Sequence, residues 1–229
     1  YIPLFLLLAF VNVTFVEPSR FLLKPKPLLV VGGCLLIVAL AWQGVWQTFA
    51  ANRSLVRALG EETAAKKNYS LIQESYKQAL SYHSLGDYEI RVRLALFVIN
   101  APEITKELLH FAIKELEKEV GISKRDILIY VSLAKLYDKA GFLEEKKEYF
   151  AKSEEALKKA LALAPGRNDT YQHYAIFLLN QRRGNDARIL LGKLQGVSKE
   201  VFEGERIQWY LGMSYYVEDT TAPSIAAET

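Results

Sequence analysis

Residue types that often carry chemistry are scarce in this chain of 229 residues, which holds one cysteine and three histidines. The lone Cys34 excludes both an internal disulfide framework and a cysteine metal site, and it lies in an apolar run where it acts as a small filler. The histidines are His83, His110 and His173, and none has a His, Cys or paired carboxylate at metal-ligand spacing. His173, which precedes Tyr174, is expected on a helix surface.

Motifs for catalysis are also missing. The sequence has no Gly-rich phosphate loop, no nucleophile elbow and no HExxH motif. It therefore predicts no catalytic, cofactor-binding or metal-binding residue. Outside residues 1–49 the chain holds 26 basic and 25 acidic residues, so no basic face suggests a nucleic-acid partner.

What the chain does have is a long uncharged run, from Leu28 to Phe49. A hydrocarbon core about 30 Å thick takes about 20 helical residues at about 1.5 Å each, and this run reaches that length. Trp42 and Trp46 stand near one end, where interfacial aromatic residues are expected. The alternative is a core helix of a soluble protein, but such helices rarely run this long without a charge. The run therefore predicts a membrane-spanning helix, with the lipid bilayer as a partner.

A second uncharged run covers residues 2–16, and residues 1–49 together are expected to form a membrane region. The run lacks the basic region and the small-residue cleavage site of a signal peptide. We expect it to be a truncated span, and the chain to be the C-terminal piece of a multi-spanning protein.

The short connection between the two runs is basic, with Arg20, Lys24 and Lys26. Short basic loops stay in the cytoplasm, so the region after Phe49 is predicted to be extracytoplasmic. Basic residues also follow the second run, at positions 53, 57, 66 and 67, and they leave the opposite orientation open.

The remaining sequence reads as all-α. A juxtamembrane linker helix is expected over 50–67, a repeat domain over 68–217 and a flexible tail over 218–229. Apolar residues at helical spacing, broken by Gly, Pro and Asn, predict the helices of the repeat domain. Their expected ranges are 69–83, 88–99, 103–119, 126–140, 144–163, 169–181, 185–195 and 204–217.

Four of these helices share a motif in which a large residue precedes a small one and another large residue follows three positions later. The small residue lets a second helix approach closely. The small residues are 39, 41 and 37 positions apart. The motif members are Leu94, Ala95 and Val98; Leu133, Ala134 and Tyr137; Tyr174, Ala175 and Leu178; and Leu211, Gly212 and Tyr215.

The intervening helices fit the same register. Ser153, Leu157, Ala160 and Pro165 follow one first helix, and Ala187, Leu191 and Leu194 follow the next. The whole pattern resembles the tetratricopeptide repeat (TPR). These repeats are longer than the usual length of about 34 residues, because residues 141–149 add about two turns. A generic helical bundle with alanine at packed positions is the alternative.

Charged stretches such as 114–119 and 144–148 alternate in sign, which is typical of a solvated helix face. A stack of TPR-like helix pairs would form an α-solenoid. Its concave surface commonly holds a peptide or a partner protein.

The order of these features resembles a known family. Residues 1–12, YIPLFLLLAFVN, look like the last conserved span of bacterial O-antigen ligase/polymerase-type membrane proteins, in a subgroup with one further span and C-terminal TPR repeats. Residues 76–91, YKQALSYHSLGDYEIR, are similar to the segment that opens the repeats in that subgroup. The resemblance implies a glycan transferase of the cell envelope that uses a polyprenyl-linked glycan at the bacterial inner membrane, with its functional residues upstream of Tyr1.

Two hypotheses follow. In the first, the chain is the anchor and docking domain of such a glycosyltransferase of polysaccharide biosynthesis. In the second, it belongs to a non-enzymatic membrane-anchored TPR scaffold or a secretion/assembly factor. In both, the fragment binds partners and has no catalytic site of its own.

Overall fold

The computed structural model of the chain describes residues 27–64, 67–197 and 205–221, and every regular element within them is an α-helix. The all-α prediction is therefore confirmed for this part of the chain. The predicted span 2–16 lies outside the described residues. The chain divides into two compact units, residues 1–90 and residues 91–229.

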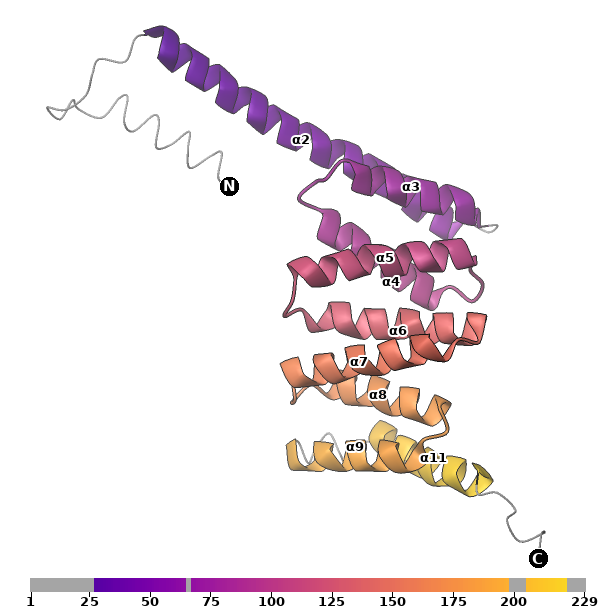
Figure 1. Cartoon of the computed structure of the whole chain (residues 1–229). Helices are drawn as coiled ribbons and strands as arrows, with labels where there is room; N and C mark the ends of the chain where they lie inside the picture. Colours follow the sequence, from indigo (N-terminus) through magenta and orange to yellow (C-terminus); the bar gives the residue numbers. More distant parts are fainter. Residues whose placement is uncertain (1–26, 65–66, 198–204, 222–229) are drawn as a thin grey trace, which may run out of the picture. The chain divides into compact units, whose positions relative to one another are not determined.

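The first unit contains the long helix α2, Pro27–Thr63, which has 37 residues (Figure 1). The predicted span over 28–49 and most of the predicted linker over 50–67 thus form one unbroken helix. Large apolar side chains of the span face outward, for example Leu35 at 65% and Trp42 at 69% exposure. A core helix would be buried, so the predicted span within α2 is not part of the folded interior. By length and composition, α2 alone among the described helices could cross a membrane.

The last part of α2 packs against α3, Tyr69–Ser81, in the same unit. Ala51, Leu55 and Ala58 stand on one face of α2 and are buried, as are Ile72 and Tyr76 of α3. The Tyr76 hydroxyl donates a hydrogen bond of 2.6 Å to the Glu62 carboxylate of α2. The segment beyond Phe49 is therefore one half of a packed helix pair as well as a connection.

The second unit is a stack of helices that begins within α4, Asp87–Asn100, at Arg91. The helices α5 to α9 lie one beneath another with their axes roughly aligned (Figure 1). The chain continues through α5, Lys106–Ile122; α6, Ile127–Glu144; α7, Lys147–Leu163; α8, Asn168–Asn180; α9, Gly184–Val197; and α11, Glu205–Thr221. The first residues of the predicted tail, up to Thr221, are therefore helical.

Short polar residues and one tight turn set the helix ends. Thr105 and Asp126 accept hydrogen bonds from the backbone N–H groups of Leu108 and Leu128, which caps the starts of α5 and α6. Glu145 adopts a left-handed backbone, with φ of 57°, and ends α6. The predicted boundary of this helix at residue 140 is therefore wrong, because α6 continues for another turn.

Gly141 explains how this extra turn packs. A Cβ at position 141 would lie 2.6 Å from the Phe150 ring of α7, so only glycine permits this approach. The ring of Phe150 also meets that of Phe142 edge to face, with centroids 5.1 Å apart. The inserted residues thus lengthen the α6–α7 pair without breaking it.

The expectation that residues 114–119 form a solvated face is wrong for two carboxylates. Glu115 and Glu119 are 6% and 2% exposed. Arg91 of α4 reaches both, with a nitrogen to oxygen distance of 2.7 Å to Glu119 and 3.5 Å to Glu115. The Ser123 hydroxyl donates a further hydrogen bond to Glu119 at 2.8 Å. A distant partner, Arg91, and local partners such as Ser123 together compensate the cost of burying these charges.

Candidate binding groove

Most residues of the repeat motif lie in the interior of the second unit. The hydroxyl of Ser153 in α7 donates a hydrogen bond of 2.8 Å to the Ala134 carbonyl of α6, where the two helices approach closely. Pro165 is exposed after α7. The buried motif residues are Leu94, Ala95, Val98, Leu133, Ala134, Tyr137, Ala160, Tyr174, Ala175, Leu178, Ala187 and Leu191.

The fourth motif differs. Leu211 is partly buried, but Gly212 is exposed and no atom lies within 4 Å of the place where a Cβ would stand. Tyr215 is 59% exposed, and the Arg188 guanidinium lies 4.5 Å from its ring centroid. The expectation that Gly212 is a close-packed position is therefore wrong, because no described residue packs against α11 at this position.

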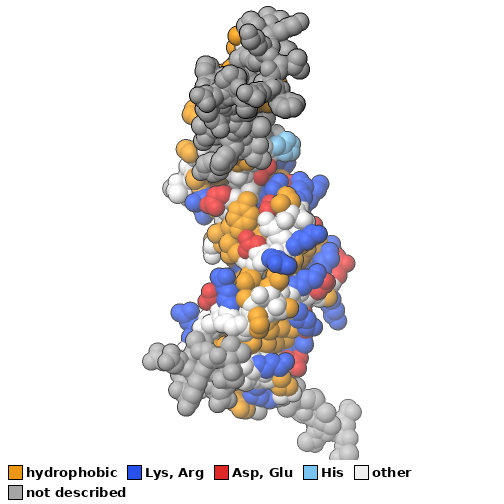
Figure 2. Space-filling view, turned by 90° about the vertical axis from the view of Figure 1, so that its left-hand side faces the viewer, with side chains coloured by type: hydrophobic (Ala, Val, Ile, Leu, Met, Phe, Trp, Pro, Cys, Tyr) orange, Lys and Arg blue, Asp and Glu red, His pale blue; other side chains and the backbone are white. Residues whose placement is uncertain are grey.

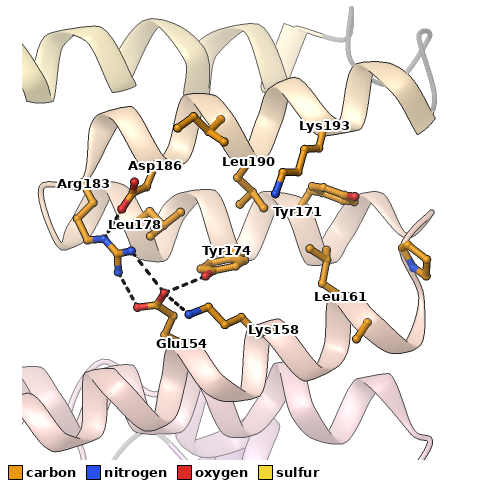
Figure 3. A pocket seen from close by; sticks show the side chains of 13 residues that line it. Glu154, Lys158, Leu161, Tyr171, Tyr174, Leu178, Arg183, Asp186, Leu190 and Lys193 are labelled. Atoms are coloured by element: carbon orange, nitrogen blue, oxygen red, sulfur yellow. Dashed lines mark hydrogen bonds and ion pairs between the residues drawn. The ribbon is translucent and has the colours of Figure 1, made fainter.

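On the face that Figure 2 shows, hydrophobic side chains are exposed in patches between lysine and arginine side chains. An open groove of about 510 Å³ is formed by α7, α8 and α9. Its floor is aromatic and aliphatic, with Tyr171, Tyr174 and Leu178 of α8 (Figure 3). Leu161 of α7 and Leu190 of α9 form apolar walls.

One end of the groove is closed by an ionic network around Glu154 of α7. Arg183 donates to both Glu154 carboxylate oxygens, at 2.6 and 3.4 Å, and to Asp186 at 2.7 Å. Tyr174 and Lys158 also contact one Glu154 oxygen, at 3.0 and 2.8 Å (Figure 3). The two acidic and two basic side chains of this network are all paired, so this end of the groove is fixed and close to neutral in charge.

The ionic network shifts the pKa values of Glu154 and Tyr174. Burial by itself would raise the pKa of Glu154, but hydrogen bonds from Arg183, Lys158 and Tyr174 lower it to about 2. Burial and the neighbouring Glu154 charge raise the pKa of the Tyr174 hydroxyl. Both groups therefore keep fixed protonation states near neutral pH, Glu154 as acceptor and Tyr174 as donor.

Lys193 of α9 stands at the other end of the groove, and its ammonium group points over the floor near Tyr171 (Figure 3). Within the described ranges of the chain, it has neither a hydrogen bond nor an ion pair. A cation over an apolar, aromatic floor attracts an anionic group of a ligand whose apolar part fills the floor.

A smaller groove of about 260 Å³ repeats this arrangement one helix pair earlier, between α5, α6 and α7. Its floor residues Tyr130, Leu133 and Tyr137 precede Tyr171, Tyr174 and Leu178 by 41 positions each. Here too a tyrosine donates to a glutamate of the preceding helix, Tyr137 to Glu117 at 2.6 Å. The grooves are therefore a product of the repeat itself.

Another group of titratable residues lies on α6 and α8. His173 is partly buried, which corrects its expected surface position, and burial followed by the charge of Lys135 lowers its pKa to about 4. Burial raises the pKa of Asp138 to about 6.

His110 of α5 contacts Glu144 at 2.5 Å, which ties α5 to the end of α6. In the part of the chain that the structure describes, no three His, Cys, Asp or Glu residues are placed to hold a metal ion.

Sequence reasoning missed most of the groove. Of its lining residues, the repeat pattern includes only Tyr174, Leu178 and Pro165, and it predicts a packing role for them. Glu154 and Arg183 stand 29 positions apart, so nothing local signals their pairing. Lys193 is one lysine among many in the sequence.

Comparison with known proteins leaves the family open. No family model matches this chain, and no curated protein matches it. Among solved structures, MamA protein has 15% identity and a TM-score of 0.48 over 79% of this chain and 98% of its own. TTC0263, a thermophilic TPR protein in Thermus thermophilus, has 15% identity and a TM-score of 0.46, over 79% of this chain and 93% of its own. Neither likeness identifies a ligand, and the predicted O-antigen ligase relationship gains no support.

Proposed function

We propose that the chain is a membrane-anchored TPR-like interaction domain that binds a protein segment and performs no chemistry itself. The observation that carries this proposal is the open groove on α7, α8 and α9, with its apolar floor and the unpaired Lys193. This proposed function corresponds to the hypothesis of a non-enzymatic scaffold or assembly factor. The buried motif residues of three helix pairs support the TPR-like assignment, because they fall at equivalent places in each pair.

The anchor is supported by α2. Its exposed apolar part and its packed part belong to one helix, so the interaction domain would start within a few residues of the membrane surface. A floor of tyrosine and leucine favours an apolar or aromatic side chain of the partner, and Lys193 favours a nearby carboxylate. The expected ligand is therefore a short segment that combines acidic and apolar residues.

The groove can be tested with the full chain in lipid nanodiscs. Random peptides displayed on phage should be enriched for acidic and apolar residues, and the enriched peptides should lose binding to the Lys193→Glu variant. Lys147→Glu is the matched control, because Lys147 is exposed at the start of α7 and does not line the groove. Absence of enrichment, or equal binding to Lys193→Glu, would contradict the proposal.

The glycan-transferase hypothesis is a finer proposal, and its support is the resemblance of residues 1–12 and 76–91. It expects about ten further apolar spans and a long loop with Arg and His in the natural chain before Tyr1. Deleting residues 68–229 from such a parent should weaken or misdirect glycan transfer without abolishing turnover. An upstream sequence with no further span would refute it.

A further inference from the structure

A second cavity, of about 280 Å³, lies in the first unit between α2 and α3. Aromatic residues line one side, with Trp46 and Phe49 of α2 in tilted contact at a centroid distance of 6.2 Å. Arg53 and Arg57 line it further along α2, and Gln78 and Tyr82 of α3 complete the polar side. Its walls therefore change from apolar to strongly polar along the helix axis.

The electrostatics of this cavity differ from those of the α7–α9 groove. Arg53 and Arg57 stand one helical turn apart, and the lining contains no carboxylate. Among the residues that the structure describes, neither arginine has a hydrogen bond or an ion pair. Two adjacent guanidinium groups without counter-charges suit an anion with several acceptor oxygens.

The position of the arginines along α2 sets the depth of such an anion. The uncharged run ends at Phe49, and at about 1.5 Å per residue Arg53 lies about 6 Å beyond it and Arg57 about 12 Å. The headgroup layer of a bilayer adds about 5–8 Å to each side of the hydrocarbon core. When Phe49 stands at the edge of the core, Arg53 is therefore level with the lipid phosphates, and the long side chain of Arg57 can reach back to the same level.

We propose that this cavity binds the phosphate group of a membrane phospholipid, an inference that rests on the proposed membrane anchoring of α2. Arg53 and Arg57 hold the phosphate oxygens, while the Tyr82 hydroxyl and the Gln78 amide provide further donors. The acyl chains descend along the exposed surface of Trp46 and Phe49, which are 57% and 59% exposed. The bound lipid fixes the height of the packed α2–α3 pair above the bilayer.

The test uses the full chain, extracted in mild detergent and examined by native mass spectrometry. Wild type is expected to retain one phospholipid, and the Arg53→Gln/Arg57→Gln variant to lose it. Arg125→Gln/Arg182→Gln is the matched control, since it removes the same charge from two exposed positions outside this cavity. Inorganic phosphate added to delipidated protein distinguishes a lipid ligand from a free anion.

Each outcome decides between the alternatives. Loss of the phospholipid only in the Arg53/Arg57 variant supports the proposal. Equal retention by both variants, no retained lipid in wild type, or tight binding of inorganic phosphate to the delipidated protein would overturn it. Alkaline carbonate extraction of membranes separates this inference from the proposed function. A chain that is washed off the membrane refutes anchoring itself, whereas an integrated chain without retained lipid refutes the phosphate site alone.

Discussion

Ala134 and Gly212 hold the same place in the repeat motif but have different surroundings. Ala134 is 1% exposed against α7, whereas nothing lies within 4 Å of a Cβ added at Gly212. We therefore expect Ala134→Leu to lower the free energy of unfolding by about 1–3 kcal/mol through overpacking. Gly212→Leu should cause no loss and can gain about 0.5–1 kcal/mol of helix propensity. Thermal unfolding in detergent, followed by far-UV circular dichroism, compares the two; an equal drop in both would contradict the packing described.

Asp138 gives a pH-dependent prediction at the same scale. Burial raises its pKa from 3.8 to about 6, and its Oδ1 atom has no hydrogen-bond partner in the described part of the chain. The folded state thus holds this proton more tightly than the unfolded state. Stability from this group is complete below pH 3.8 and is lost as pH rises through about 6. Asp138→Asn should therefore unfold at a higher temperature than wild type above about pH 6, with the difference vanishing in acid. A pH-independent difference would exclude this explanation.

At the scale of whole elements, Arg91 links α4 to α5. Its guanidinium contacts the buried carboxylates of Glu115 and Glu119, and Lys118 also pairs with Glu115. Arg91→Ala should destabilise the second unit by about 3–5 kcal/mol, the usual cost of removing one partner of a buried pair. Adding Glu115→Gln and Glu119→Gln should restore part of this loss. Chemical denaturation of the variants measures both effects, and a minor loss in Arg91→Ala would show that other partners, not Arg91, compensate these carboxylates.

The elements were largely predictable from sequence because each helix needs an apolar face at helical spacing and a stop signal. Thus the expected ranges 88–99 and 169–181 differ from α4 and α8 by one residue at each end. Contacts across the stack were not predictable in this way. Arg91 and Glu119 are 28 positions apart, and the turn at Glu145 has no glycine to signal it. The sequence motif at Gly212 also looks the same whether or not a helix covers it.

For the molecule as a whole, the basic residues Arg20, Lys24 and Lys26 predict that the repeats lie outside the cytoplasm. If the repeats are extracytoplasmic, a Lys147→Cys variant in a Cys34→Ser background should react with a membrane-impermeant maleimide in intact cells, or in spheroplasts where an outer membrane is present. Lys147 suits this purpose because it is exposed. Labelling only after lysis would place the repeats in the cytoplasm.

We expect a protein segment to occupy the groove of α7, α8 and α9 in the cell. The most direct measurement of this occupancy is photo-crosslinking with p-benzoylphenylalanine placed at Ile189, which lines the groove and is 55% exposed. The control position is Ile122, which is 72% exposed at the end of α5 and lies outside the groove. We expect a discrete crosslinked protein at Ile189, with the crosslink mapping to an acidic and apolar segment, and its loss in the Lys193→Glu variant. The same crosslinking at Ile122 and Ile189, or none at Ile189, would contradict it.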